Sequence, residues 1–300
     1  YFMDNLLDLH MHSNYSIDGE FTPEELMEKC AEAGLKVAAL ADHNTVRGIP
    51  HAKGAASRLG LDFFTALEID CTHEGRNFHL LGYGINETAA IFHDIEQSVH
   101  TQAVNSSKKL IELIKQQGFF FDEKLAWAKA VNDVIEAEMI AELILSDKRN
   151  DDNKLLLPFR DGGKRSDNPL VNFYWDFCSQ GKPAHVPMHF MSLAAAVSAI
   201  QENGGAAVLA HPGANMGQNL EITASIIKTG IDGIEAYSSY HDNETRQFYA
   251  DICLKHGLTA TSGSDFHGKT KPSVHLGELV NPTAHDTYER LTQLIKKRHM

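Results

Sequence analysis

The chain of 300 residues lacks the features that mark a membrane-spanning or secreted protein. No run of about 18 apolar residues occurs, so we expect no membrane span. The N-terminus shows no basic region followed by an apolar stretch, so we expect no signal peptide. Only four cysteines are present, and no two form a C-x-x-C pair. Scattered cysteines are typical of reduced thiols rather than of a disulfide framework, which predicts a cytoplasmic protein.

An excess of positive charge is also missing, because the formal net charge is -13 at pH 7. A broadly acidic surface argues against a protein that coats long nucleic acid through a basic face. It leaves open an enzyme that draws a phosphate into one small positive pocket. Histidine, in contrast, is abundant with 17 residues, and the placement of these residues carries the functional prediction.

Seven short apolar runs predict β-strands, and helical patterns separate most of them. The first helix has clear start signals, with Thr22 as N-cap, Pro23 at the first helical position and Glu25 three residues after the cap. Strands that alternate with helices predict an α/β protein with a parallel sheet, either a closed barrel or an open doubly wound sheet. The predicted strands are 5–12, 37–43, 63–71, 77–84, 206–211, 233–237 and 258–265.

The stretch 101–181 interrupts this alternation. It contains two helical patterns, 103–118 and 125–146, and polar loops, but no clear strand signal. We therefore predict a discontinuous barrel domain, 1–100 and 182–300, that carries a mostly helical insertion subdomain over 101–181.

Clusters of histidine and carboxylate side chains lie on or just after six of the predicted strands, mostly at their C-terminal ends. In a parallel α/β barrel, active sites assemble at this rim. A single histidine in a strand is more often a hydrogen-bonded core residue, but burying so many imidazoles and carboxylates together is costly without a cation. Imidazole combined with carboxylate suits Zn, Mn or Fe. The candidate residues are His10, His12, Asp42, His43, Glu68, His79, His211, Asp265 and His267.

The motifs that contain these residues are, in order, "DLHMHS", "LADHNT", "ALEI", "HLLGYG", "AHPG" and "GSDFHG". As a set they resemble the motifs of the PHP (polymerase and histidinol phosphatase) family, and they look most like its stand-alone metal-dependent phosphoesterases. The resemblance implies a distorted (β/α)7 barrel, a trinuclear centre of up to three divalent ions (zinc, manganese or iron), and hydrolysis of phosphate esters. It also implies that a metal-activated hydroxide is the nucleophile, so that no side chain attacks the substrate.

The resemblance further implies a distribution of ligands over three ions. The first ion would be bound by His10, His12, Glu68 and Asp265, the second by Glu68, His79 and His211, and the third by Asp18, His43 and His267. Glu68 would bridge the first two ions, and the two ligands of "GSDFHG" would bind different ions. Asp18 lies in "HSNYSIDG", a loop one residue longer than the family pattern. Asp8 and Asp42 are expected to orient metal-bound histidines.

Four further residues are candidates for substrate binding. By the resemblance, His241 projects toward the site and contacts phosphate; the alternative is a surface histidine at a helix start. Arg160, Lys164 and Arg165 in the insertion would clamp a second phosphate or a nucleotide backbone; the alternative is a solvated loop.

The insertion departs from the pattern of relatives that act on nucleoside bisphosphates or short RNA, which carry basic residues near this position. Segment 134–145 contains Glu136, Glu138 and Glu142 and no His, Lys or Arg. An acidic helix over a phosphate site would repel an extra phosphate, which weakens a direct transfer of that specificity.

Taken together, the sequence predicts a metal-dependent phosphoesterase for a small phosphorylated metabolite, nucleotide or short oligonucleotide, with no long nucleic acid or membrane as partner. One alternative is a metal-dependent amidohydrolase, although no strand-end lysine signals its usual carboxylated lysine. Another alternative is a non-catalytic PHP module, although no polymerase is attached and the ligand set looks complete.

Overall fold

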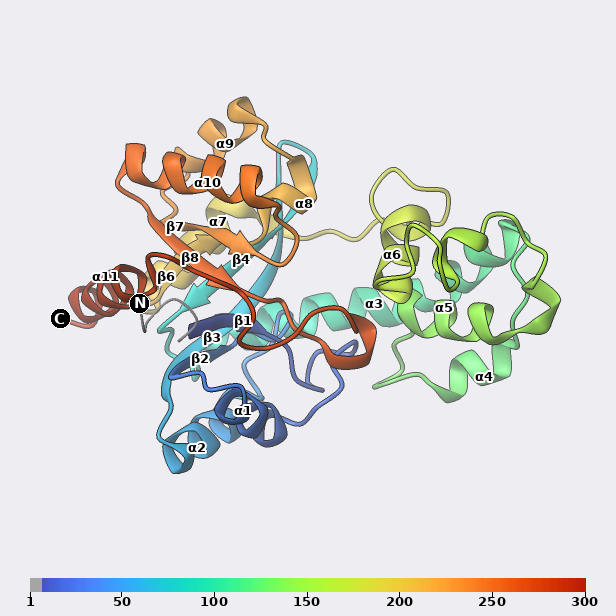
Figure 1. Ribbon diagram of the computed structural model, residues 1–300, viewed down its shortest axis with the longest axis horizontal. Coiled ribbons are helices and arrows are strands. Elements are labelled where there is room, and N and C mark those ends of the chain that lie inside the picture. Colours follow the sequence, from blue (N-terminus) through green and yellow to red (C-terminus); the bar gives the residue numbers. More distant parts are fainter. Residues whose placement is uncertain (1–6) are drawn as a thin grey trace.

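The computed structural model describes residues 7–300, which fold around a mixed sheet that curves into an almost closed barrel (Figure 1). All seven predicted strands are present, although Asn5 and Leu6 of the first one lie outside the described residues. The short strand β5 was not predicted. The strands are β1 Leu7–Met11, β2 Val37–Leu40, β3 Asp62–His73, β4 Arg76–Tyr83, β5 Met191–Ser192, β6 Ala206–Leu209, β7 Gly233–Ser238 and β8 Thr259–Gly263.

The strand order is β1-β2-β3-β4-β6-β7-β8, with β5 paired to β3. The prediction of a wholly parallel sheet is wrong at β4, which runs antiparallel to both β3 and β6. The two residues between β3 and β4 allow a hairpin but leave no room for a crossover helix. The barrel closes where Asp265 N donates to His10 O at 2.7 Å and His12 N donates to Phe266 O at 3.0 Å. The predicted distorted seven-stranded barrel is therefore confirmed.

Helices cover the outside and one end of the barrel (Figure 1). The predicted start of α1 is confirmed: Thr22 Oγ1 accepts from Glu25 N at 3.2 Å, and Glu25 Oε2 accepts from Thr22 N at 2.9 Å. Inside the barrel, Leu9, Leu81 and neighbouring strand residues form one buried cluster with Leu291 of the last helix. The helices around the barrel are α1 Pro23–Glu32, α2 Ile49–Leu59, α7 Leu193–Glu202, α8 Pro212–Met216, α9 Leu220–Ile227, α10 Asn243–His256 and α11 Ala284–Arg298.

Between β4 and β5 the chain forms a helical region beside the barrel (Figure 1). The long helix α3 leads into it from the sheet, and the region has its own apolar cluster, which includes Phe119, Ile140 and Phe173. Because α3 begins at Ala90, the boundaries 101–181 of a separate subdomain stay a prediction. The helices here are α3 Ala90–Gln116, α4 Glu123–Ala128, α5 Ala137–Ser146 and α6 Pro169–Phe173, followed by a π-helical turn Tyr174–Cys178.

The predicted continuous helix over 125–146 is wrong, because the chain breaks between α4 and α5. Asn132 and Asp133 adopt left-handed φ values of 50° and 65°, a conformation that asparagine and aspartate tolerate better than most residues. The break makes Glu136 the residue that precedes α5. Over residues 7–300, no helix combines the length and apolar character needed to cross a membrane.

Candidate metal centre

Histidine and carboxylate side chains converge at one rim of the barrel. They come from β1, β3 and β4 and from the segments that follow β1, β2, β6 and β8, which the closed sheet brings together. The structure places every predicted ligand in this cluster: His10, His12, Asp18, His43, Glu68, His79, His211, Asp265 and His267.

The first set of ligand atoms lies around the end of β1. The Nε2 atoms of His10 and His12 are 3.0 Å apart. They lie 3.2 and 3.3 Å from Glu68 Oε2 and 3.5 and 3.1 Å from Asp265 Oδ1. Ligands at about 2.1 Å from a divalent ion are separated by roughly 3.0–3.4 Å, so these four side chains have the spacing of one coordination shell.

A second set forms around the other oxygen of Glu68. Glu68 Oε1 lies 2.9 Å from His79 Nδ1 and 3.1 Å from His211 Nε2. Because its two oxygens face different histidines, Glu68 has the geometry of a bridging ligand between two neighbouring ions.

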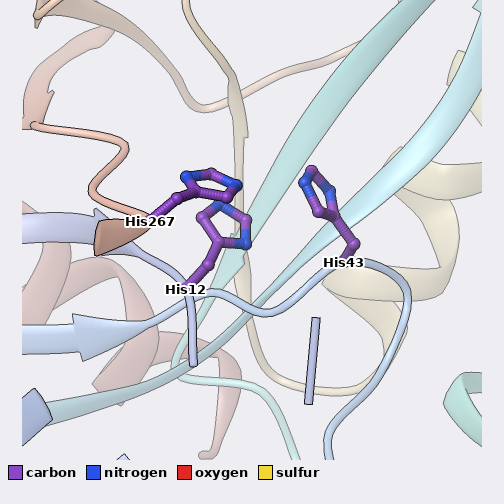
Figure 2. Close-up of side chains that lie close together, drawn as sticks. All are labelled: His12, His43 and His267. Carbon is purple, nitrogen blue, oxygen red and sulfur yellow. The ribbon is translucent and has the colours of Figure 1, made fainter. Parts of the chain in front are cut away.

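A third group consists of the imidazoles of His12, His43 and His267, which lie close together at the rim (Figure 2). The ring of His12 is 4.3 Å from that of His43 and 4.1 Å from that of His267, between centroids. His267 Nδ1 donates to Asp265 O at 2.9 Å, which leaves its Nε2 to face Asp18 Oδ2 at 3.1 Å. The third predicted set therefore comes together, with His12 as an additional neighbour.

Several of these atoms are buried and form no hydrogen bond of acceptable geometry, even where an opposite group lies within 3.5 Å, namely Glu68 Oε2, Asp265 Oδ1, Asp18 Oδ1 and His267 Nε2. Leaving such groups unpaired inside a protein costs free energy, and a cation in their midst removes that cost. A donor set of imidazoles and carboxylates is also the one that divalent transition metals prefer. The cluster therefore fits divalent metal ions.

Glu235 on β7 supports this cluster, and the sequence analysis missed it. It is fully buried; Oε1 accepts from His10 Nδ1 at 2.9 Å, and Oε2 accepts from His211 N at 2.8 Å. The first contact fixes the tautomer of His10 so that Nε2 faces the cluster, as second-shell carboxylates do at metal sites. The available signal was a glutamate within the apolar strand "GIEAY".

The predicted orienting roles of Asp8 and Asp42 need correction. Asp42 does not reach an imidazole directly: its Oδ1 accepts from Ser16 Oγ at 2.8 Å, and Ser16 Oγ lies 3.1 Å from His12 Nδ1. Asp8 Oδ1 accepts from two backbone amides, Ser264 N at 2.9 Å and His10 N at 3.3 Å. Asp8 thus links β1 to the segment after β8, which carries Asp265 and His267.

Asp70 is a second missed residue. It pairs with His79 across the β3–β4 ladder, and its Oδ1 lies 3.1 Å from His79 Nε2. Its other oxygen accepts from Asn44 Nδ2 at 2.7 Å. Because antiparallel strands place paired residues side by side, the β3–β4 hairpin positions this carboxylate beside the imidazole.

Two predicted ligands have left-handed backbone conformations. Asp265 has a φ of 57°, which aspartate tolerates, whereas the φ of 22° at His211 is strained. Such strain persists where the surrounding structure enforces it, and it is common at functional sites. At both positions the chain turns away from its strand just as the side chain meets the cluster.

Mutual electrostatics give neighbouring imidazoles opposite protonation states. Burial alone would lower the pKa of His43, but the carboxylates of Glu68, Asp18 and Asp70 outweigh it and raise the pKa to about 10. Burial and the nearby His267 and His43 lower the pKa of His12 to about 3. His12 is therefore neutral and ready to act as a ligand at neutral pH, whereas His43 holds a proton that a metal ion would displace.

A cavity of about 350 Å³ opens between this rim and the helical region, and the metal-ligating candidates form part of its wall. Lys271, which follows β8, also lines it. The lysine is only 4% exposed; its Nζ pairs with Asp265 Oδ2 and lies 5.0 Å from the centre of the Tyr240 ring. It is a buried cation on the metal side of the cavity, and the sequence analysis missed it.

The four residues predicted to bind substrate do not line this cavity. His241 is 3% exposed, and both ring nitrogens contact backbone: Nε2 accepts from Gly213 N and Nδ1 donates to Ala236 O, each at 2.9 Å. Arg165 pairs with Asp176 at 2.9 Å, Arg160 contacts Asp151 at 3.4 Å, and Lys164 is exposed. These side chains have local partners or face solvent, and their phosphate-binding role stays a prediction.

Fold and site together define a class, the α/β-barrel proteins with a cluster of metal-ligating residues at the rim. The family model of the PHP domain matches residues 8–144, and that span contains the first four motifs and two thirds of the predicted ligands. The resemblance to the PHP family is therefore confirmed over this part of the chain.

Curated relatives and solved structures agree with this assignment. The 3',5'-nucleoside bisphosphate phosphatase of Chromobacterium violaceum is 28% identical over 87% of each chain, and the 5'-3' exoribonuclease of Haemophilus influenzae is 28% identical over 88% of this chain and 91% of its own. A structure described as an amidohydrolase from C. violaceum, with bound sulfate and no metal, has a TM-score of 0.77 at 26% identity and covers 95% of this chain and 96% of its own. A proposed metal-dependent phosphoesterase from Bifidobacterium adolescentis has a TM-score of 0.76 at 25% identity and covers 96% of both chains.

Proposed function

We propose that the chain is a metal-dependent phosphoric ester hydrolase whose active centre is the rim cluster. The observation that carries this proposal is the position of Glu68. Its two oxygens lie 2.9–3.3 Å from nitrogens of His10, His12, His43, His79 and His211. Five imidazoles around one fully buried carboxylate form a site for more than one divalent ion.

We assign the ligands as the resemblance to the family implies, and the clustering of these side chains supports the assignment. His10, His12, Glu68 and Asp265 hold one ion, Glu68 with His79 and His211 a second, and His43 with His267 and Asp18 a third. The ions are Zn, Mn or Fe, because the donor atoms are nitrogen and carboxylate oxygen in the part of the chain that the structure describes.

Divalent ions bound here would acidify a water molecule and neutralise the charge of the phosphoryl oxygens. The residues of the chain prepare the site for this chemistry. Glu235 keeps His10 in one tautomer, and Ser16 lies between Asp42 and His12. Cys178 lines the cavity, but burial raises its pKa, so its thiol is not an activated nucleophile.

Lys271 is the residue we assign to the phosphoryl group. One of its three N–H donors is committed to Asp265 Oδ2, and the ammonium group lies at the cavity wall beside the first set of ligands. A buried ammonium bonded to a ligand carboxylate can direct a further N–H to a phosphoryl oxygen. It would stabilise negative charge in the transition state.

The substrate class follows from the cavity and the relatives. A cavity of about 350 Å³ takes a small phosphorylated metabolite, a nucleotide or the end of a short oligonucleotide. The curated relatives are named for a nucleoside bisphosphate, a cyclic phosphodiester and RNA. A cytoplasmic location stays a prediction.

The test is hydrolysis by protein stripped of metal and reloaded separately with Mn²⁺, Zn²⁺ or Fe²⁺. The substrates are p-nitrophenyl phosphate, a nucleoside 5'-monophosphate, a 5'-phosphorylated RNA trinucleotide and an N-acyl amino acid. We expect phosphoester turnover that depends on metal and no turnover of the amide. Turnover of the amide alone, or none of any phosphoester by protein with a filled site, would overturn the proposal.

A further inference from the structure

The wall of the cavity that faces the metal centre comes from the helical region and the segment that returns from it, and its surface is largely apolar. It is built from side chains of α3, the π-helical turn and residues 185–190. The main contributors are Val99, Leu110, Tyr174, Trp175, Val186 and Phe190. Such a wall suits an aromatic ring or another apolar group of the substrate.

Two carboxylates interrupt this apolar wall. Glu136 precedes α5, Glu138 lies in its first turn, and both are partly buried and line the cavity. In the metal-free protein, burial and the charge of Asp18 raise the pKa of both, that of Glu138 to about 7. Divalent ions bound beside Asp18 would offset its charge and favour the ionised form of both glutamates. The N-terminus of a helix ordinarily favours an anion, but here acidic side chains of the chain itself already occupy that end of α5.

Positive charge in the cavity is confined to the barrel wall. Of the described residues that line the cavity, the lysines and arginines are Arg47 and Lys271. Arg47 Nε pairs with Glu96 Oε1 at 2.6 Å, and Lys271 pairs with Asp265. His100 and His185 each point a ring nitrogen at a backbone carbonyl. A phosphate bound away from the metal centre would therefore meet mostly carboxylates, because Glu96 offsets the charge of Arg47.

We propose that Glu136 and Glu138 select the substrate: they favour a phosphate monoester whose remaining part is apolar or aromatic, and they exclude a second phosphate from the cavity. This inference rests on the proposed function. A second phosphate beside them meets ionised carboxylates or forces them to take up protons, and either event costs binding free energy. The chain would thus differ in specificity from the nucleoside bisphosphate phosphatase that it resembles.

The experiment compares adenosine 5'-monophosphate with adenosine 3',5'-bisphosphate as substrates of the metal-loaded protein. The double variant Glu136→Gln/Glu138→Gln keeps the shape of both side chains but removes their charge. Glu142→Gln is the matched control, because Glu142 is on the same helix but pairs with Lys129 at 2.9 Å and lies outside the cavity lining.

We expect wild-type protein to prefer the monophosphate, and the double variant to raise kcat/KM for the bisphosphate relative to the monophosphate by about tenfold or more, as expected for two charges at partly buried sites. The control should leave this ratio unchanged. Calorimetry with analogues that carry sulfur in place of one 5'-phosphoryl oxygen, which slows hydrolysis, should show the same change in relative affinity.

Two results would overturn the inference while leaving the proposed function intact. One is a wild-type preference for the bisphosphate, and the other is a ratio that the double variant does not change. If the metal-loaded protein hydrolyses no phosphoester, the proposed function fails, and this inference fails with it.

Discussion

The two walls of the cavity are built on different principles. On the barrel wall, nearly every ionisable group contacts another, so that Glu68 alone touches five imidazoles. On the opposite wall, apolar side chains dominate, and two carboxylates stand among them. Contacts between charged side chains fix the positions of those side chains, and catalysis requires fixed positions. An apolar surface with two carboxylates, in contrast, discriminates between ligands by their polarity and charge. We infer that the barrel wall supplies catalysis and the opposite wall supplies specificity.

The largest expected effect on catalysis comes from removing the charge of Glu68, the central carboxylate of the barrel wall. Glu68→Gln keeps the shape of the side chain but loses the charge that two sets of ligands share. We expect bound metal to fall and kcat to drop by at least about a thousandfold, since metal-assisted activation of water is lost. Metal content by mass spectrometry and phosphate release are the measurements. Glu244→Gln on the exposed face of α10 is the control, and equal loss in both variants would contradict the assignment.

Lys271→Gln should separate transition-state stabilisation from metal binding. We expect kcat to fall by about a hundredfold, the effect of removing one charged donor near the reacting group, while bound metal stays near the wild-type level. The neighbouring Lys269→Gln, at an exposed position, should change nothing. If metal content falls in parallel with kcat, Lys271 acts only by supporting Asp265.

Glu235→Gln tests whether a carboxylate that is hydrogen-bonded to a ligand, and is not itself a ligand, is needed to position that ligand. The amide oxygen can still accept one hydrogen bond, but the charge beside His10 is lost. We expect metal affinity, measured by competition with a chelator, to weaken about 10- to 100-fold, as is usual for such partners of metal-bound histidines. An unchanged affinity would mean that His10 needs no orienting carboxylate.

A change on the opposite wall should have a smaller effect of a different kind. Trp175→Ala removes apolar contact area from the cavity, so KM for an aromatic phosphate monoester should rise about three- to tenfold while kcat stays near wild type. The only other tryptophan, Trp127, lies outside the cavity lining, so Trp127→Ala is the control. A large fall in kcat would contradict this prediction, because it would mean that the opposite wall contributes to the catalytic step.

The smallest effect is a pH dependence of the metal-free protein. The pKa of His43 is raised from 6.5 to about 10 in the folded protein. A raised folded-state pKa stabilises the fold fully below the unfolded pKa, and this stabilisation is lost as pH rises through the folded pKa. We expect the free energy of unfolding of metal-free protein to fall between about pH 6.5 and 10, and His43→Asn to flatten that slope in chemical denaturation. An unaltered slope would contradict the protonation of His43.

The protonation state of His43 can also be tested by measuring proton release when metal binds. Because His43 holds a proton at neutral pH, binding of metal should release it, which calorimetry in two buffers of different ionisation enthalpy would detect. Heat that does not depend on the buffer would contradict this protonation state.

The sequence predicted the barrel wall well and the opposite wall poorly, for a physical reason. His10, His12 and Asp265 lie near the C-terminal ends of parallel strands, and a closed barrel brings those ends to one rim whatever the loops do. The supporting role of Glu235 was not predicted, because a single glutamate within an apolar strand gives no periodic signal.

Positions in the helical region depend on packing that no local pattern reveals. Arg165 looked free in the sequence, yet Asp176 pairs with it from eleven residues away. Asn132 and Asp133 adopt left-handed φ values between α4 and α5, where the sequence predicted one continuous helix. The acidic character of segment 134–145 was visible in the sequence, whereas its place at the cavity was not.

The central claim is that the rim cluster binds the divalent ions that make the chain a phosphoesterase. The most direct test follows p-nitrophenyl phosphate turnover while metal-free protein is titrated with Mn²⁺. The account predicts no turnover without metal and a rise that saturates once the few sites of the rim are filled. Full turnover by metal-free protein, or saturation with Mn²⁺ without any turnover, would contradict it.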